Sequence, residues 1–251
     1  LIILDSCRYD VFEERSSLSG DLECRISRGS MSEEFIKGNF KNKTLHDTVY
    51  ISGNSWYAQT QDEIDAEVHH YTMIDSEYPE KTKKITEAAI SAIKQYPNKR
   101  LIIHYMLPHF PYIGEFAKQN LPDKTVQREQ LFPKLVSGDS NVTDEDLKRA
   151  YEENLDIVLE EVSDLFEYLI GKTVVTADHG ELLGERVYPI HYCEYGHPKN
   201  TYVPELVNVP WLVHDDGNGR KINSDPPSKS NLDDVTDEAI EKNLRNLGYI
   251  D

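Results

Sequence analysis

The sequence predicts an α/β fold in which helices cover a mostly parallel central sheet. Short apolar runs bounded by polar or turn residues recur at 1–4, 49–51, 101–107, 173–177 and 209–213. Their nearly continuous apolar character is typical of strands that are buried on both faces, as in a parallel sheet. Helical patterns lie between several of these runs, and this alternation indicates βαβ units in a doubly wound sheet.

Two long helices are predicted by apolar residues at helical spacing. The first covers 82–96 and ends before Pro97, because proline cannot continue a helix. The second covers 144–169, with Thr143 as its N-cap and acidic residues in its first turn, where the helix dipole favours them. Gly171 can adopt the left-handed turn that commonly follows a helix.

The chain is expected to form one domain over residues 1–251, since no second apolar core and no internal repeat is apparent. Residues 113–142 lack clear periodicity and are interpreted as a surface insertion that forms a lid over the site. The turn-rich stretch 215–234 is predicted to be a flexible loop, followed by a short helix at 237–247.

The charge balance restricts the classes of partner. The formal net charge of −18 argues against nucleic acid, because phosphate contacts need a basic surface. An anionic substrate would need a local positive centre to overcome this field, and a bound metal would supply one. No apolar run approaches the roughly 18 residues of a membrane span, so no membrane segment is expected in this chain.

The three cysteines are Cys7, Cys24 and Cys193, and their spacing matches no zinc framework. Reduced thiols in a cytoplasmic protein are the favoured interpretation. Cys7 lies close to the candidate site described below, but no base for a thiol nucleophile stands near it in the sequence.

Metal-capable side chains follow three of the predicted strands. Asp5 follows the first run, His109 follows the third, and Asp178 with His179 follows the fourth. A single Asp in such a place commonly caps the next helix, but ligands in open parallel sheets bind at the carboxyl ends of strands. A His-rich stretch at 191–197 adds further ligands. Carboxylate with imidazole favours Zn or Mn, whereas oxygen ligands alone would suit Mg or Ca.

Seven segments, in this order, resemble the sulfatase-like family of the alkaline phosphatase superfamily. They are "LIILDSCRYD", "SRGSMSEEF", "HYMLPHFPY", "TADHGELLGE", "YGHP", "VPWLV" and "LRNLGYID", and they are distributed from residue 1 to residue 251, so the resemblance extends over nearly the whole chain. The resemblance implies a three-layer α/β/α fold and a divalent-metal enzyme. Enzymes of this kind cleave or transfer phosphate or sulfate esters through a hydroxyl nucleophile.

The resemblance also implies roles for individual residues. Asp5, Asp178 and His179 match ligands of the principal metal, and Ser32 matches the nucleophile, which is itself a metal ligand. Ser30 is the alternative nucleophile. The family commonly has Thr at this position, often followed by Pro, whereas this chain has Ser32 followed by a glutamate.

Two departures from the family pattern qualify these expectations. The formylglycine signature, Cys or Ser followed by x-Pro-x-Arg, is absent, which favours phosphoester chemistry with an unmodified serine over sulfate ester chemistry. Only His109 and His197, with His191 as a spare, match the second metal site. These histidines either bind a second ion or donate hydrogen bonds to the substrate and its leaving group.

Other polar residues near these segments are expected to have lesser roles. Arg8 and Arg28 are candidates to bind an anionic oxygen through their guanidinium groups. The alternative for Arg8 is an ion pair with Asp10. His104 is interpreted as a core histidine because it lies inside a strand. Glu181 and Glu185 are assigned to the fold around the metal. Four further histidines are expected at the surface or in loops: His46, His69, His70 and His214. Trp56 and Tyr57 are candidates to line a pocket.

The sequence therefore predicts a metal-dependent hydrolase or transferase with Ser32 as nucleophile, and with His109 or His197 assisting the leaving group. Its expected substrate is an anionic ester, either a small molecule or one linked to a glycan or lipid, with phosphomonoester or phosphodiester favoured over sulfate. The alternative is a non-catalytic protein that keeps the fold and binds a metal or an anion without turnover.

Overall fold

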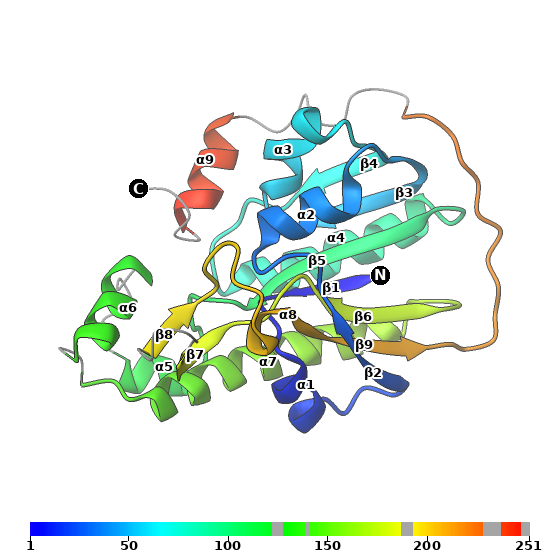
Figure 1. The fold of residues 1–251 in the computed structure, drawn as a ribbon. Helices are drawn as coiled ribbons and strands as arrows, with labels where there is room; N and C mark the ends of the chain where they lie inside the picture. The colour runs from blue at the N-terminus through cyan, green and yellow to red at the C-terminus, as the bar shows by residue number, and fades with distance from the viewer. Residues whose placement is uncertain (122–127, 139–140, 187–192, 228–236, 247–251) are drawn as a thin grey trace.

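A seven-stranded, mostly parallel sheet forms the centre of the fold (Figure 1). The computed structural model describes residues 1–121, 128–138, 141–186, 193–227 and 237–246. Across the sheet the strands follow the order β2 (Asp21–Ile26), β9 (Asn208–His214), β6 (Thr173–Ala177), β1 (Ile2–Asp5), β5 (Arg100–Pro108), β3 (Thr44–Ser52) and β4 (Glu67–Met73). A separate antiparallel pair consists of β7 (Leu182–Arg186) and β8 (Cys193–Gly196).

Helices pack on both faces of this sheet and give the three-layer α/β/α arrangement (Figure 1). One face is covered by α1 (Tyr9–Arg15), α4 (Glu80–Gln95) and α7 (Asp144–Phe166). The other is covered by α2 (Ser32–Phe40) and α3 (Trp56–Ile64). The remaining described helices are α5 (Glu115–Asn120), α6 (Arg128–Ser137), α8 (Pro204–Val207) and α9 (Asp237–Asn246). None of the described helices is both long enough and apolar enough to cross a bilayer.

The alternation of side chains along the central strands decides which residues reach which layer. In β1, Ile2 and Leu4 belong to the core under α4 and α7, whereas Ile3 belongs to the core under α2 and α3. Because neighbouring side chains in a strand point to opposite faces, Asp5 follows Ile3 onto the α2 face. The same rule takes His104 of β5 to this face. The strand pattern thus delivers both polar groups to the side of the sheet that carries Ser32.

The predicted parallel core is confirmed, and one edge of the sheet differs from the prediction. All five predicted apolar runs are strands, and β1, β3, β4, β5 and β6 pair in parallel. The run at 209–213, within β9, pairs antiparallel with both β6 and β2. Burial on both faces makes a strand apolar whichever way it runs, so composition does not encode its direction. The polar strands β2 and β4 were not predicted, because apolar residues do not dominate them.

The predicted helices are confirmed with small changes at their ends. The 82–96 pattern corresponds to α4, and the 144–169 pattern corresponds to α7, which ends at Phe166. The Thr143 hydroxyl accepts a hydrogen bond from the Asp146 amide at 3.1 Å, and the Asp146 carboxylate accepts one from the Thr143 amide at 3.0 Å. This capping box starts the helix. Gly171 has a φ of 86°, as expected for a left-handed turn.

The two segments interpreted as irregular have different outcomes. Residues 113–142 contain the helices α5 and α6, which were not predicted, and α6 packs beside β8. The function of this segment as a lid stays a prediction. Residues 215–227 contain no helix or strand, and 228–236 lie outside the described residues. The short C-terminal helix is confirmed as α9, with Leu244 buried in it.

Candidate active site

Four neighbouring strands deliver polar side chains to one edge of the sheet. Asp178 follows β6, Asp5 ends β1, and Asn54 follows β3. His104 lies in the middle of the longer strand β5, where it pairs with Ser52, the last residue of β3. These strands are adjacent in the order β6-β1-β5-β3, and they run parallel to one another. Their carboxyl ends therefore meet at one place, and this is the edge where ligands bind in open α/β sheets.

The hydroxyl of Ser32 stands at the centre of this group. Ser32 is the first residue of α2, and its Oγ donates to Asp178 Oδ2 at 2.7 Å. The same Oγ lies 3.3 Å from Asp5 Oδ2 and 3.3 Å from His179 Nε2. All four side chains are buried. The residue predicted as nucleophile and the three predicted metal ligands are thus brought together. One carboxylate oxygen of each aspartate and Nε2 of His179 surround the Ser32 oxygen.

Local hydrogen bonds hold the imidazole of His179 in one orientation. Its Nδ1 lies 2.8 Å from the carbonyl oxygen of Gly180, so this nitrogen carries the proton and donates it. The lone pair of Nε2 is then directed toward Ser32 and the two carboxylates. Gly180 permits this turn because a Cβ there would lie 2.0 Å from the Glu205 carbonyl oxygen. With Nδ1 held in this way, Nε2 is the nitrogen of this ring that would bind a metal.

Ser6 supports the two carboxylates from an unfavourable backbone conformation. It has a φ of 61°, a left-handed value that is uncommon for residues other than glycine. Its amide donates to Asp178 Oδ1 at 3.1 Å, and its hydroxyl donates to Asp5 Oδ1 at 3.1 Å. The buried Tyr151 of α7 holds the turn by donating its hydroxyl to the Ser6 carbonyl at 2.7 Å. Strained backbone of this kind clusters at functional sites.

Burial of two carboxylates side by side changes their ionisation. Burial and the neighbouring Asp178 raise the pKa of Asp5 to about 6. Burial acts in the same direction on Asp178, but the imidazole of His179, that of His104 and the Ser32 hydroxyl outweigh it and lower the Asp178 pKa below its usual range. Below about pH 6 Asp5 is therefore protonated and the pair carries one negative charge, whereas above that pH the pair carries two negative charges that a bound cation would offset.

His104 is buried in the core, as predicted, and it also faces the two carboxylates, which was not predicted. The residue is fully buried, but its Nε2 lies 3.6 Å from Asp178 Oδ2 and 3.9 Å from Asp5 Oδ2. This nitrogen has no hydrogen-bond partner among the described residues. The opposite nitrogen, Nδ1, is held at 2.9 Å by the hydroxyl of Tyr50. His104, Asp5 and Asp178 thus form a group that could hold a metal ion. The sequence shows a histidine in a strand, but not which face it reaches.

Asn54 is a second residue that the sequence reasoning missed. Its amide nitrogen donates to Asp5 Oδ2 at 2.8 Å and to Ser32 Oγ at 3.1 Å. The amide oxygen accepts from the Trp56 amide at 2.9 Å, which fixes the orientation of the group. The rule that selected Asp5, a polar residue at the end of a buried strand, would also have selected Asn54.

A second group of metal-capable residues lies beside the first and consists of His109, Glu181 and His197. All three are buried, and His197 Nδ1 lies 2.8 Å from Glu181 Oε2. The ring of His197 is 4.4 Å from that of His179 and 5.0 Å from that of His109, centre to centre. Glu181 was assigned to the surrounding fold, but its Oε1 is buried without a hydrogen-bond partner among the described residues. Its carboxylate therefore belongs to this group.

Ser30, the alternative nucleophile, lies apart from the carboxylates. Its hydroxyl donates to Glu34 Oε2 at 3.0 Å and to the Pro198 carbonyl at 3.1 Å. Neither partner is a member of the group around Ser32. Ser30 therefore holds the loop before α2 against the segment that follows β8, and the geometry favours Ser32.

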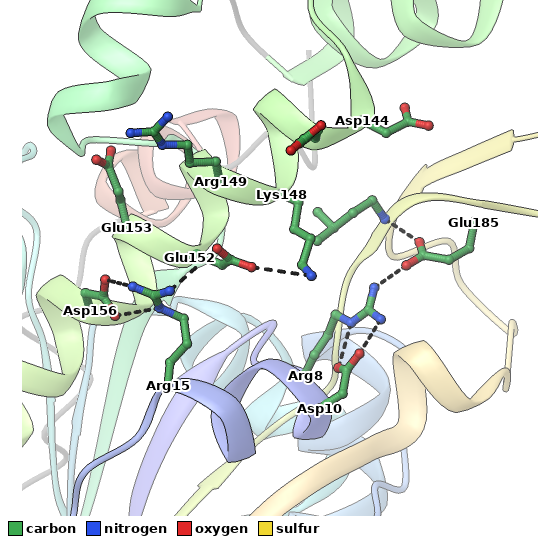
Figure 2. Close-up of a pocket in the computed structure, with 12 residues that line it drawn as sticks. Arg8, Asp10, Arg15, Asp144, Lys148, Arg149, Glu152, Glu153, Asp156 and Glu185 are labelled. Carbon is green, nitrogen blue, oxygen red and sulfur yellow. Dashed lines mark hydrogen bonds and ion pairs between the residues drawn. The ribbon is translucent and has the colours of Figure 1, made fainter.

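Arg8 takes part in ion pairs and does not face Ser32. Its guanidinium donates to Asp10 at 2.9 and 2.7 Å and to the Glu185 carboxylate. Figure 2 shows these pairs in a charged groove of about 830 Å³ between α1, α7 and β7. On the opposite wall Arg15 pairs with Asp156. The predicted pairing of Arg8 with Asp10 is thus confirmed. Arg28 donates to the Gly38 carbonyl at 2.8 Å on the surface.

Several of the remaining candidates lie where they were expected, and Tyr57 does not. His46, His69 and His214 bind partners at the surface, and Cys7 is fully buried. Tyr57 does not line a pocket, because it is buried in an aromatic cluster whose other members are Phe40, Tyr50 and Tyr71. His191 lies outside the described residues.

No protein-family model matches this chain, and no curated protein matches it. Solved structures do match. One is the integral membrane protein lipooligosaccharide phosphoethanolamine transferase A (EptA) from Neisseria meningitidis, with a TM-score of 0.55 and 11% identity. The match covers 86% of this chain but only 47% of that one. The periplasmic domain of EptC from Escherichia coli, in complex with Zn, matches 86% of this chain and 72% of its own, with a TM-score of 0.53 and 13% identity.

BT4656, in complex with its substrate D-glucosamine-2-N,6-O-disulfate, matches 100% of this chain and 76% of its own, with a TM-score of 0.55 and 13% identity. All three are enzymes of the alkaline phosphatase superfamily. The chain has the alkaline phosphatase-like fold. The mostly parallel sheet of seven strands and the helices on both of its faces agree with this assignment.

Burial of Cys7 predicts that its thiol is unreactive in the native protein. The side chain is fully buried, and burial raises its pKa well above the usual value. A brief treatment with a maleimide should therefore modify the exposed Cys24 and leave Cys7 unmodified, as measured by peptide mass mapping. Cys24 is the internal control. Equal modification of both thiols in the native protein would contradict the burial and reopen a role for Cys7.

Proposed function

We propose that this protein is a metal-dependent hydrolase or transferase of anionic esters, with Ser32 as its nucleophile. The observation that carries the proposal is the position of the Ser32 hydroxyl at the start of α2, 2.7 Å from the Asp178 carboxylate and within 3.3 Å of Asp5 and His179. A hydroxyl that is buried among two carboxylates and an imidazole is arranged for chemistry at its oxygen.

The residues of this group fit a divalent metal. Two carboxylates lie buried together, and the lone pair of His179 Nε2 faces them. Asp5, Asp178 and His179, together with the Ser32 oxygen, would hold the ion. Carboxylate and imidazole ligands favour Zn or Mn, with Mg or Ca as alternatives. The EptC neighbour was solved with Zn, which supports this choice. His109, Glu181 and His197 could hold a second ion.

A bound divalent ion would lower the pKa of the serine hydroxyl and neutralise charge on the ester. The residues of the chain supply the rest. Asp178 Oδ2 is the nearest acceptor for the Ser32 proton. The Asn54 amide, which donates to the Ser32 oxygen, is placed to donate to an oxygen of the reacting anion.

The transfer step forms a bond from the Ser32 oxygen to phosphorus or sulfur and breaks the bond to the leaving oxygen in line with it. His109 or His197 would give a proton to that leaving oxygen, since the His197 ring lies beside that of His179 and the His109 ring lies beside that of His197. Water, or an acceptor alcohol in a transferase, would then release the group from Ser32. We favour a phosphate ester, because the formylglycine signature is absent, and keep a sulfate ester as the second choice.

A second candidate function is a non-catalytic protein that binds a metal or an anion. The enclosure of the centre favours it, since Asp5, Ser32, Asp178, His179 and His197 are only 0–3% exposed. A centre that is closed in this way holds an ion well but offers a substrate no entry without movement. Turnover of aryl phosphate, phosphodiester and aryl sulfate substrates, measured together with metal content, separates the two functions.

Replacement of Ser32 tests the nucleophile directly. Ser32→Ala should lower turnover of the best of these substrates by roughly 10³-fold or more, because it removes the attacking oxygen. The metal content should fall only modestly, since Asp5, Asp178 and His179 remain.

Ser30→Ala is the matched control for this change. It removes the same atom two residues away and should keep most of the activity per folded molecule. If Ser30→Ala is inactive and Ser32→Ala is active, Ser30 is the nucleophile. If both variants keep full turnover, no serine ester is formed and the covalent route is wrong.

His104 should contribute to metal affinity although the family resemblance did not assign it. His104→Gln removes the imidazole nitrogen that faces Asp5 and Asp178. The affinity for Zn²⁺, measured by competition with a chromogenic chelator, should fall by about 10- to 100-fold. His70→Gln is the control, because His70 stacks on Tyr96 away from the centre. Equal affinities for the wild type and His104→Gln would show that His104 has only a packing role.

A further inference from the structure

The strand β2 forms an open edge of the central sheet. It pairs with β9 on one side, and no described strand pairs with it on the other (Figure 1). Five of its six residues are exposed, among them the apolar Ile26, which is 69% exposed. An open edge presents unpaired backbone N–H and C=O groups, which are a template for a further strand. The strand contains no proline, lysine or bulge that would block such pairing.

The register between β2 and β9 decides which residues present these backbone groups. The N–H of Ser27 donates to the Val207 carbonyl at 2.8 Å, so the pair next to the end of β2 is hydrogen-bonded. Hydrogen-bonded and non-hydrogen-bonded pairs alternate along an antiparallel ladder. Cys24 therefore stands opposite Pro210 in a non-hydrogen-bonded pair, which suits a proline because it has no N–H. The backbone N–H and C=O of Cys24 thus point to the open edge.

The open edge of β2 is complementary to a second copy of itself. By the same alternation, Leu22 and Ile26 also direct their backbone groups away from β9. Two copies of β2 can run antiparallel with Cys24 opposite Cys24 of the second copy. Leu22 then lies opposite Ile26 of the second copy, and every outward N–H and C=O of these residues has a partner. The exposed Ile26 side chain also gains an apolar neighbour.

The charged side chains of β2 select this register. Glu23 and Arg25 lie on one face of the strand, and their side chains are 57% and 56% exposed. With Cys24 opposite Cys24, Glu23 lies opposite Arg25 of the second copy, and Arg25 lies opposite its Glu23. Opposite charges directly across an antiparallel pair stabilise it, whereas like charges destabilise it. A shift of two residues in either direction would place Glu23 against Glu23 or Arg25 against Arg25.

We propose that two copies of this chain associate through antiparallel pairing of their β2 edges, which joins their two sheets into one. The contact is isologous and closes at two copies. The formal net charge of −18 on each chain opposes association, and the pairs between Glu23 and Arg25 supply a local attraction against it.

This arrangement leaves the Ser32 centres apart. Both β2 and β6 run antiparallel to β9, so β2 runs parallel to β6 and ends at the same edge of the sheet as the Ser32 centre. Because the two copies of β2 run in opposite directions, the two centres lie at opposite edges of the joined sheet. Variants that abolish the dimer should therefore keep the metal content of the wild type.

Exchange of the two charges tests the interface and its register. In sedimentation equilibrium of the full chain, the wild type should form dimers with a Kd of about 100 µM or tighter, as expected for a small contact. Glu23→Arg and Arg25→Glu each place like charges opposite one another and should raise this Kd by about 5-fold or more. One change raises the net charge of the chain and the other lowers it, so long-range repulsion cannot explain a loss in both.

The double variant Glu23→Arg with Arg25→Glu is the matched control, because it places opposite charges across the pair again. Its Kd should return to within about 3-fold of the wild-type value. A wild type that stays monomeric throughout this range overturns the proposal. So does a dimer whose Kd is unchanged by both single changes, or a double variant that dimerises as weakly as the single variants.

Cross-linking at Cys24 tests the register independently. The Cα atoms of directly opposite residues in a hydrogen-bonded antiparallel pair lie about 5.5 Å apart, within reach of a short bis-maleimide that adds to both thiols. Cys24 is exposed, and Cys193 is partly exposed. Wild type and Cys193→Ser should form covalent dimers, and Cys24→Ser and Arg25→Glu should not. Dimers that sediment as such but are linked only through Cys193, or are not linked at all, would show a different interface.

Discussion

Two carboxylates buried face to face at the ends of adjacent strands are the constraint on which the rest of the site depends. Asp5 ends β1, and Asp178 follows β6, its neighbour in the sheet. Like charges in a buried place repel, and only a proton, a cation or hydrogen-bond donors can compensate them. The chain surrounds the pair with donors from Ser6, Ser32 and Asn54. This compensation is partial, because the pKa of Asp5 stays raised to about 6.

The position of the pair at the carboxyl edge of the sheet lets both helical layers contribute to it. The α2 layer supplies Ser32, and the α7 layer supplies Tyr151, which holds the strained Ser6 turn. A sheet buried on both faces separates its two layers everywhere except at its edges. The chemistry is therefore concentrated where the strands end and the layers meet.

Sequence reasoning found the residues whose signal is local. Asp5, Asp178 and His179 could be predicted because each directly follows an apolar strand, and α7 could be predicted from its stripe and its Thr143 cap. His104 was predicted correctly to lie in the core, but its contact with Asp178 was missed, because the sequence does not show which face of the sheet a strand residue reaches. The direction of β9 was likewise not encoded in its composition.

The central claim is that the Asp5–Asp178 pair is completed by a divalent cation, and elemental analysis tests it most directly. The wild type, equilibrated with Zn²⁺ or Mn²⁺ and then freed of excess metal, should retain about one or more ions per chain with an affinity of about micromolar or tighter. Asp178→Asn should fold and lose the ion of this site, because the amide can still hydrogen-bond the Ser32 oxygen but lacks the charge. A wild-type protein that retains neither metal, or an Asp178→Asn variant that retains as much as the wild type, would contradict the account.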